Sequence, residues 1–312
     1  MRRSAWWAWV GLPILGVLIA FALAPLILLG DMRRPLERMP GDVGVERYEE
    51  VEMKPLDEPL TLRGWYYPVA AAKAVVILVH GGGDNRASRY SSMIELARDL
   101  GRRGYAALAI DLRNHGQSDA SRLAVPTFGP TEANDVIGAI EFLAQRAPGL
   151  PVAALGFSMG GNAVLYAAAK DSRLRAIVTV ATYADFSEVI ANAAAASTGV
   201  PALVLRPVIW SAEAFYGLPV SWARAEDIAP RLLPGSLLVI HNEADPIVPV
   251  EHARRLAEAA PEAQLWVTPA PPDDHPVLAA SGPWGTHVRS FELHPEEFLD
   301  RVTAHIAART GG

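Results

Sequence analysis

The sequence contains no cysteine. This absence excludes disulfide bonds, thiolate metal sites, a cysteine nucleophile and a lipid anchor of the lipobox type. It leaves the redox compartment open, because a chain without cysteine suits the inside and the outside of a cell equally well.

Positive charge is also scarce. The 312 residues carry a net charge of −6, and no dense cluster of lysine and arginine is interleaved with aromatic residues. Such clusters are the electrostatic signature of nucleic-acid-binding proteins, so we expect no nucleic-acid partner. With 51% hydrophobic and 20% charged residues, the composition is typical of a globular protein that buries a large core.

One long stretch, residues 5–30, lacks charged side chains altogether. As a helix with a rise of ~1.5 Å per residue it would measure ~39 Å, more than the ~30 Å hydrocarbon core of a bilayer. Trp6, Trp7 and Trp9 cluster at one end, where a membrane protein places its aromatic belt. We therefore predict that residues 1–30 form an uncleaved, single-pass transmembrane anchor.

Two alternatives to an anchor stay open. The segment could be a signal peptide cleaved at residues 22–24 (Ala-Leu-Ala), although the uncharged run is long for one, or it could be a buried core helix. Arginines flank both ends of the segment. A short basic N-terminus usually stays in the cytoplasm, which would place the bulk of the chain on the extracytoplasmic side.

Residues 31–44 contain proline, glycine and mixed charge without periodicity, which predicts a linker before a domain at residues 45–312. Within that domain, strand-like runs alternate with helix-like segments. The alternation predicts an α/β fold with a mostly parallel central sheet, flanked by helices and opened by an antiparallel pair of strands. We expect strands at 45–53, 60–69, 73–80, 105–111, 151–155, 176–181, 236–241 and 264–267, and helices at 88–103, 131–145, 160–170, 250–260 and 295–308.

Two stretches interrupt the alternation. Residues 184–230 contain apolar helical segments at 188–196 and 202–216 but no strand-like run. An insertion of this size at the ends of the strands predicts a helical cap over a site, and a long crossover is the alternative. The second stretch, residues 268–294, is a proline-rich loop of a length that is usually functional or mobile.

The most informative motif is Gly-Phe-Ser-Met-Gly at residues 156–160, between a predicted strand and a predicted helix. A serine on so tight a turn is held exposed, and the flanking glycines let neighbouring backbone approach without Cβ clashes. The start of the helix also points N–H groups and a positive dipole end at the place where an oxyanion would form. Ser158 is therefore the candidate nucleophile, and a glycine-rich structural turn is the alternative.

A nucleophilic serine needs a base to take its proton and an acid to orient that base. Asp245 is the candidate acid, because it follows a predicted strand and sites of open α/β sheets lie at the carboxyl ends of strands. His287, in the loop after the next strand, is the candidate base. The alternatives that stay open are a structural turn role for Asp245, Glu243 as the acid, and His275 or His294 as the base.

An oxyanion hole needs two backbone donors. The loop at residues 80–86 (His-Gly-Gly-Gly-Asp-Asn-Arg) follows the first long parallel strand, and its glycines let N–H groups approach a substrate carbonyl. The amides of Gly82 and Met159 are the candidate donors. A nucleotide-binding loop is the rival interpretation, but neither G-x-x-x-x-G-K-[ST] nor a G-x-G-x-x-G that opens the next helix is present.

These motifs resemble those of serine hydrolases of the α/β-hydrolase superfamily, in the order Ser, Asp, His. Residues 80–83 are similar to its H-G-x-G loop, and residues 156–161 match its nucleophile elbow. Residues 111–118 are similar to its D-x-R-G-H-G-x-S segment, with Asn114 in place of the usual glycine. Further similarities are the acid turn at residues 245–249 and His287 followed by residues 295–298, the latter resembling a membrane-tethered bacterial esterase-like branch.

The resemblance covers roughly residues 45–310 and implies an α/β-hydrolase fold. It further implies hydrolysis of carboxylic esters or thioesters through an acyl-enzyme, without a metal or an organic cofactor. Ser158, His287 and Asp245 would form the catalytic triad. The expected partners are a small-molecule ester with an apolar acyl part and, through the N-terminal helix, a membrane. A serine peptidase or acyltransferase with the same triad, and a non-catalytic membrane-tethered binding protein, are the alternatives.

Overall fold

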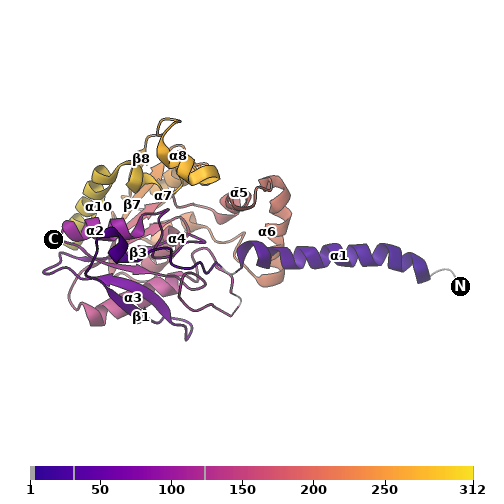
Figure 1. Cartoon of the computed structure of the whole chain (residues 1–312), viewed down its shortest axis with the longest axis horizontal. Helices are drawn as coiled ribbons and strands as arrows, with labels where there is room; N and C mark the ends of the chain where they lie inside the picture. The colour runs from indigo at the N-terminus through magenta and orange to yellow at the C-terminus, as the bar shows by residue number, and fades with distance from the viewer. Residues whose placement is uncertain (1–3, 31, 123, 312) are drawn as a thin grey trace.

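The computed structural model describes residues 4–30, 32–122 and 124–311. At its centre lies one eight-stranded sheet with the strand order β1-β2-β4-β3-β5-β6-β7-β8 (Figure 1). The pairs β1·β2 and β2·β4 are antiparallel, and all other pairs are parallel. The predicted sheet, mostly parallel and opened by an antiparallel pair, is confirmed. The strands are β1 (Glu49–Met53), β2 (Leu62–Tyr67), β3 (Val75–Val79), β4 (Ala106–Ile110), β5 (Val152–Phe157), β6 (Leu174–Val180), β7 (Leu237–Asn242) and β8 (Gln264–Thr268).

Helices cover both faces of the sheet, because successive side chains of a strand point to opposite faces. In β3, Val75, Ile77 and Val79 belong to one apolar cluster, and Val76 and Leu78 belong to another. Helices α3 (Ala133–Arg146), α4 (Met159–Ala168) and α7 (Glu251–Ala259) supply the first cluster, and α2 (Met93–Arg102) and α10 (Pro295–Thr310) supply the second.

Two local predictions were wrong. The helix expected from residue 88 begins at Met93. Before it, the amide of Ala87 donates to Asn85 Oδ1, and the hydroxyl of Ser88 donates to Asp84, so these short polar side chains stabilise a loop in place of helix. The loop expected at 268–294 contains two short helices, α8 (Pro276–Ser281) and α9 (Ser290–Leu293).

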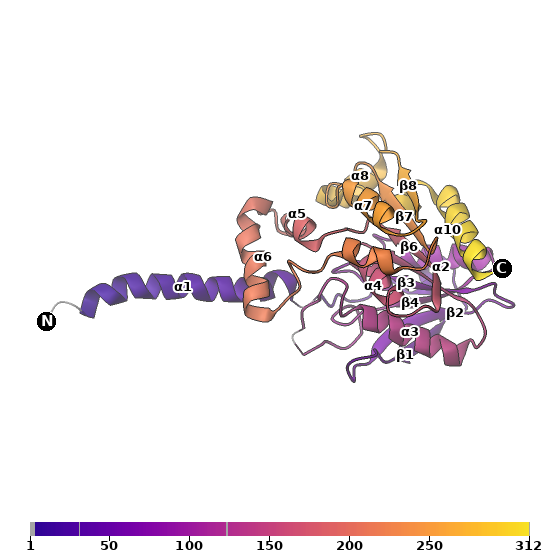
Figure 2. The same ribbon diagram turned by 180° about the vertical axis from the view of Figure 1, so that it is seen from behind.

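The insertion between β6 and β7 consists of α5 (Phe186–Thr198), α6 (Ala202–Tyr216) and short 3-10 turns, without a strand among its described residues. Asp185 caps the start of α5 by accepting the amide of Ser187, and Gly199 ends it in the left-handed conformation with φ 73°. The two helices meet at an angle of 117°. They lie at the end of the molecule from which the N-terminal helix projects (Figures 1 and 2).

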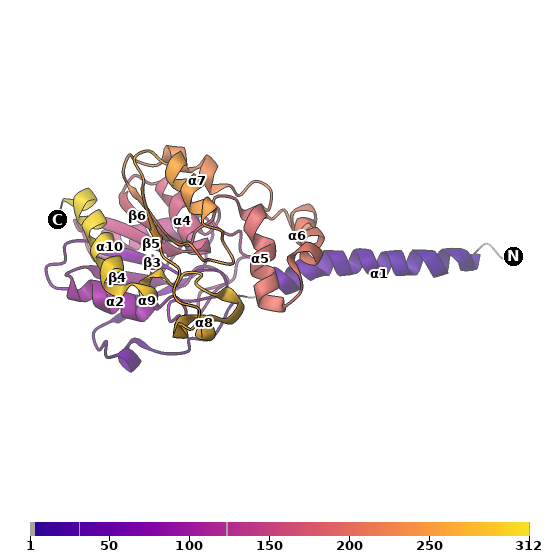
Figure 3. The ribbon, with the colours of Figure 1, turned by 90° about the horizontal axis from the view of Figure 1, so that it is seen from above.

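The N-terminal helix α1 (Ser4–Leu29) is apolar over Val10–Ile27, with a mean hydropathy of 2.5. Residues 10–20 are exposed, and this part extends away from the domain (Figure 3). The end of the helix packs on the protein, where Leu29 is buried in the core. The side chains of Trp6, Trp7 and Trp9, expected in an aromatic belt, lie outside the described residues.

Residues 32–44, expected to be a linker, also pack on the domain. Arg38 is buried, donates hydrogen bonds to the carbonyls of Ala87 and Ser88, and forms an ion pair with Glu95. The side-chain amide of Asn85 donates to the carbonyls of Arg34 and Pro35 at 3.3 Å. This segment therefore belongs structurally to the sheet domain.

Candidate active site

Ser158 occupies the turn between β5 and α4, with φ 50° and ψ −115°. This is a strained conformation for a residue with a Cβ atom, and such strain concentrates at functional sites. The turn is held by the amide of Ser158, which donates to the carbonyl of Val180 at 2.8 Å. The side chain is partly exposed toward a pocket.

The glycines on either side of Ser158 are required by close backbone contacts. A Cβ atom at Gly156 would lie 2.3 Å from the carbonyl oxygen of Gly160. At Gly160, a Cβ atom would lie 2.3 Å from the carbonyl oxygen of His80. The spacing of the motif therefore reflects how closely the start of α4 packs on β5 and on the end of β3.

Asp245 lies in the turn after β7, where it is 7% exposed. Its Oδ1 accepts the amides of Ile247 and Val248, both at 2.9 Å. Burial alone would raise the pKa of Asp245, but the adjacent imidazole of His287, its hydrogen bond and the nearby His241 together lower it. The carboxylate is therefore ionised at neutral pH and can orient a histidine.

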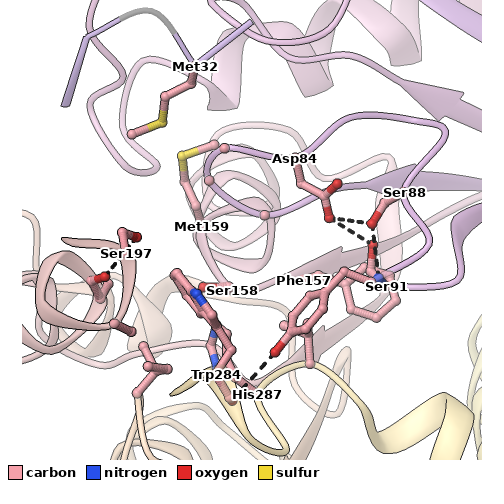
Figure 4. Close-up of a pocket in the computed structure, with 18 of the residues that line it drawn as sticks. Met32, Asp84, Ser88, Ser91, Phe157, Ser158, Met159, Ser197, Trp284 and His287 are labelled. Carbon is pink, nitrogen blue, oxygen red and sulfur yellow. Dashed lines mark hydrogen bonds between the residues drawn. The ribbon is translucent and has the colours of Figure 1, made fainter. Parts of the chain in front are cut away.

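His287 is the histidine that Asp245 orients. Its Nδ1 lies 2.8 Å from Asp245 Oδ2, and the side chain is 2% exposed. An ionised carboxylate only accepts hydrogen bonds, so Nδ1 carries the proton and Nε2 has the free lone pair. Ser158 and His287 line the same pocket (Figure 4).

The alternative base residues lie elsewhere. His275 caps the start of α8, and its Nδ1 accepts the amide of Val277 at 3.2 Å. The ring of His294 packs against Trp266, with the ring centroids 6.2 Å apart. Neither histidine lines the pocket that contains Ser158. Glu243, the alternative acid, accepts the amide of Ala270 at the surface.

The two candidate oxyanion donors are neighbours. A Cβ atom at Gly82 would lie 3.7 Å from Met159 Sδ and 4.0 Å from Met159 Cβ, and both residues line the pocket. Among the described residues, neither backbone amide donates to another protein group. Two unpaired N–H groups beside Ser158 are available to an oxyanion.

The pocket has a volume of about 700 Å³. One wall is apolar and comes from α5, with Phe186, Val189 and Ile190. The opposite wall is polar, where Asp84 accepts hydrogen bonds from the hydroxyls of Ser88 and Ser91 (Figure 4). Burial raises the pKa of Asp84 to about 6, although its hydrogen bonds oppose this shift.

Sequence reasoning missed two parts of this pocket. Asp84 lies within the predicted oxyanion loop, and its place directly after three glycines was a signal that could have found it. The second part is the wall from the end of α1 and the following segment, including Ile27, Leu29 and Met32. Only the tertiary contact brings these residues to the pocket.

Two further buried histidines, His80 and His115, pack against each other. The rings of His80 and His115 lie 4.9 Å apart, and burial lowers the pKa of each to about 4. His80 Nε2 accepts the amide of Leu112 at 3.1 Å.

Asn114 stands where the similar family segment has a glycine. Its φ of 65° lies in the left-handed region that favours glycine, which accounts for that preference.

In the described part of the chain, no group of three or more His, Asp or Glu side chains could hold a metal ion.

The chain is similar to several known proteins. A family model described as "Serine aminopeptidase, S33" matches residues 70–212. A segment of 135 residues is 33% identical to monoglyceride lipase of Homo sapiens and covers 43% of this chain and 41% of the lipase. Protein ABHD12B of Homo sapiens is 25% identical over 286 residues, 80% of this chain and 71% of that protein.

Among solved structures, an esterase of Pyrococcus furiosus is similar with a TM-score of 0.71 and 22% identity, covering 90% of this chain and 98% of the esterase. This likeness confirms the predicted α/β-hydrolase fold. The chain has the α/β-hydrolase fold, and the proteins to which it is similar include one named as a lipase and one named as an esterase. The matched segment spans less than half the length of the human lipase.

Proposed function

We propose that the protein is a membrane-anchored serine hydrolase that cleaves carboxylic esters or thioesters. The observation that carries this proposal is the hydrogen bond of 2.8 Å between His287 and Asp245, on the wall of the pocket that also contains the strained Ser158. A buried, oriented imidazole in the same pocket as a partly exposed serine is an arrangement that suits nucleophilic catalysis.

The reaction would proceed in two halves. His287 Nε2 takes the proton of Ser158 as the hydroxyl oxygen attacks the ester carbonyl, and the amides of Gly82 and Met159 stabilise the oxyanion. The imidazolium, stabilised by Asp245, then gives its proton to the leaving alcohol or thiol. Water repeats the sequence on the acyl-enzyme, which releases the acid and restores the serine.

The names of the relatives support an ester substrate. The human relative is named a lipase, and the Pyrococcus furiosus relative an esterase. A serine peptidase with the same residues is the second candidate, favoured by the family description as a serine aminopeptidase. Hydrolysis of an ester and of the amide with the same acyl group separates the two, since a peptidase cleaves both.

The anchor is part of the proposal. The carbonyls of Phe21 and Ala22 accept hydrogen bonds from Ser211 and Tyr216 of α6, and Leu29 is buried in the core. A signal peptide that is removed has no need for such contacts, so we propose that α1 is retained. The short basic N-terminus favours a catalytic domain on the extracytoplasmic side. N-terminal sequencing of the protein from membranes tests retention, and protease treatment of intact cells and spheroplasts tests the orientation.

The test of the catalytic residues is labelling by a fluorophosphonate probe in detergent. Wild type is compared with Ser158→Ala, His287→Ala and the control His275→Ala, which removes a histidine outside the pocket. We expect labelling of the wild type and of His275→Ala only. A folded wild type that does not label contradicts the hydrolase assignment and favours a binding protein.

A further inference from the structure

The outer face of α6 is exposed and mostly apolar, with Arg206 as its one charged side chain among the described residues. Leu203 is 78% exposed, and Trp210, two helical turns further along the same stripe, is 59% exposed. Val204 and Phe215, exposed to 61% and 54%, extend this face. The opposite face of the helix packs on the protein through Leu205, Ile209 and Ala212. An exposed apolar face of this size marks a surface that something covers.

α6 contacts the N-terminal helix at one level of that helix. Ser211 Oγ donates to the carbonyl of Phe21 at 2.8 Å, and the hydroxyl of Tyr216 donates to the carbonyl of Ala22. α6 lies across the axis of α1 in Figures 1 and 2, and α5 lies across it in the view turned by 90° (Figure 3). A helix transverse to a membrane-spanning helix lies parallel to the membrane surface.

The length of the projecting part of α1 fixes the depth of α6. From Ser4 to Phe21 the helix rises ~26 Å at ~1.5 Å per residue, close to the ~30 Å hydrocarbon core. The exposed part of α1, residues 10–20, ends where the contacts with α6 begin. When α1 spans the bilayer, α6 therefore lies at its surface.

The pocket reaches the surface of the protein beside the end of α1, on the domain side of the contacts with α6. Ile27 of α1, which is 80% exposed, lines the pocket together with the exposed Ser197 and Thr198 at the end of α5. Val189 and Ile190 continue the wall inward toward Ser158. This route connects the surface beside α1 with the apolar wall of the pocket.

We propose that α6 lies in the membrane interface with its outer face in the lipid, and that substrate enters the pocket from the bilayer. This proposal rests on the anchored hydrolase proposed above and names its substrate class: esters of long acyl chains that reside in the membrane. The occupant of the α6 face is the lipid bilayer, because α6 packs directly against the apolar helix α1 that would span the membrane. Tryptophan and phenylalanine on one face of a helix are typical of such interfacial helices.

The absence of cysteine allows a direct test of depth. Single-cysteine variants Leu203→Cys and Trp210→Cys of the full chain are labelled with an environment-sensitive fluorophore and reconstituted into phosphatidylcholine vesicles. Leu56→Cys is the matched control, since Leu56 is 63% exposed but follows β1, away from the cap. We expect spin-labelled lipid to quench the probes at 203 and 210 but not at 56, and aqueous iodide to do the reverse.

Three outcomes overturn the docking of α6 in the bilayer. Quenching of the probes at 203 and 210 by iodide, as at 56, would place α6 in water. Protection from both quenchers would mean that a second copy of the chain covers the face. Equal lipid quenching at all three positions would mean that the vesicles bind the domain nonspecifically.

The route of the substrate is tested with Leu203→Glu and Trp210→Glu in the same vesicles. We expect at least about a tenfold loss of activity toward a palmitate ester of methylumbelliferone carried in the vesicles, and no change toward water-soluble p-nitrophenyl acetate, because charge displaces α6 from the lipid. Leu56→Glu should change neither. Equal effects on both esters, or none, overturn entry from the bilayer. If wild type cleaves neither ester, the hydrolase proposal fails. The quenching measurement would still test whether α6 lies in the bilayer.

Discussion

The Nδ1 atom of His287 lies 2.8 Å from Oδ2 of Asp245, whose other oxygen accepts the amides of Ile247 and Val248. Because the two carboxylate oxygens have different partners, the hydrogen bond between Asp245 and His287 is sensitive to replacement of the aspartate by the isosteric asparagine. In Asp245→Asn, Oδ1 can still accept both amides, so the amide group must face His287 and donate to Nδ1. The imidazole would then hold its proton on Nε2, the wrong tautomer for a general base.

We therefore expect Asp245→Asn to fold normally and to lose about 10³- to 10⁴-fold in kcat toward a soluble ester. Glu243→Gln, the neighbouring acid at the surface, should retain nearly full activity. A retained kcat in Asp245→Asn would mean that the carboxylate does not orient the base. Steady-state kinetics with circular dichroism as the folding control measure both.

The glycine at position 160 is predicted to be essential for stability. Alanine there would bring a Cβ atom to 2.3 Å from the carbonyl oxygen of His80. This clash can be relieved only if the backbone of one of the two segments moves. We expect Gly160→Ala to lower the free energy of unfolding by about 1–3 kcal/mol or more. Gly41→Ala, which meets no atom within 4 Å, is the control and should change it by less than about 0.5 kcal/mol. Equal melting temperatures would show that the elbow relaxes.

His115 predicts a dependence of stability on pH. Burial lowers its pKa to about 4 in the folded chain, below the ordinary value of 6.5, so the unfolded chain binds more protons between these pH values. Folded stability is therefore present above pH 6.5 and is lost as the pH falls toward 4, at up to roughly 1.4 kcal/mol per pH unit. Asp84, with a pKa raised to about 6, acts in the opposite direction, so the test needs a difference between two proteins.

The variant His115→Asn supplies that difference. Asparagine can still donate to the carbonyl of Arg113, as Nδ1 of His115 does at 2.8 Å, but it does not titrate. Denaturant unfolding of both proteins from pH 7 to 4 should show a smaller loss of stability on acidification in His115→Asn. Parallel curves would contradict the role assigned to the buried imidazole.

Arg38 predicts that the segment before the sheet is part of the folded unit. Its guanidinium donates hydrogen bonds to two loop carbonyls and forms an ion pair with Glu95. In Arg38→Ala these three groups would lose the arginine as a partner. We expect a loss of about 2–4 kcal/mol in the free energy of unfolding. Arg122→Ala, at an exposed position, is the control. A loss no larger than that of the control would make residues 32–44 a linker, as composition suggested.

These residues also show how far sequence reasoning reaches. The sheet and the order of Ser158, Asp245 and His287 follow from local patterns, because alternation of strands and helices and short turn motifs are encoded in adjacent residues. The start of α2 at Met93 could not be found in this way, because polar side chains of the preceding loop compete with the helix.

Long-range packing was the other limit. His275 and His287 lie in the same proline-rich segment of the sequence. Only the folded structure shows that His275 caps a helix and that His287 is the partner of Asp245. In the same way, nothing in the composition of residues 31–44 indicates that Arg38 is buried. Such contacts join residues tens of positions apart, and a single sequence does not record them.

The central claim is that Ser158 forms an acyl-enzyme. Acid quenching of the full chain during turnover of a p-nitrophenyl ester, followed by peptide mass spectrometry, tests it most directly. We expect an added acyl mass on the peptide that contains Ser158 in the wild type, and no added mass on the corresponding peptide of Ser158→Ala. An acyl group on another residue, or turnover by Ser158→Ala at the wild-type rate, would contradict it.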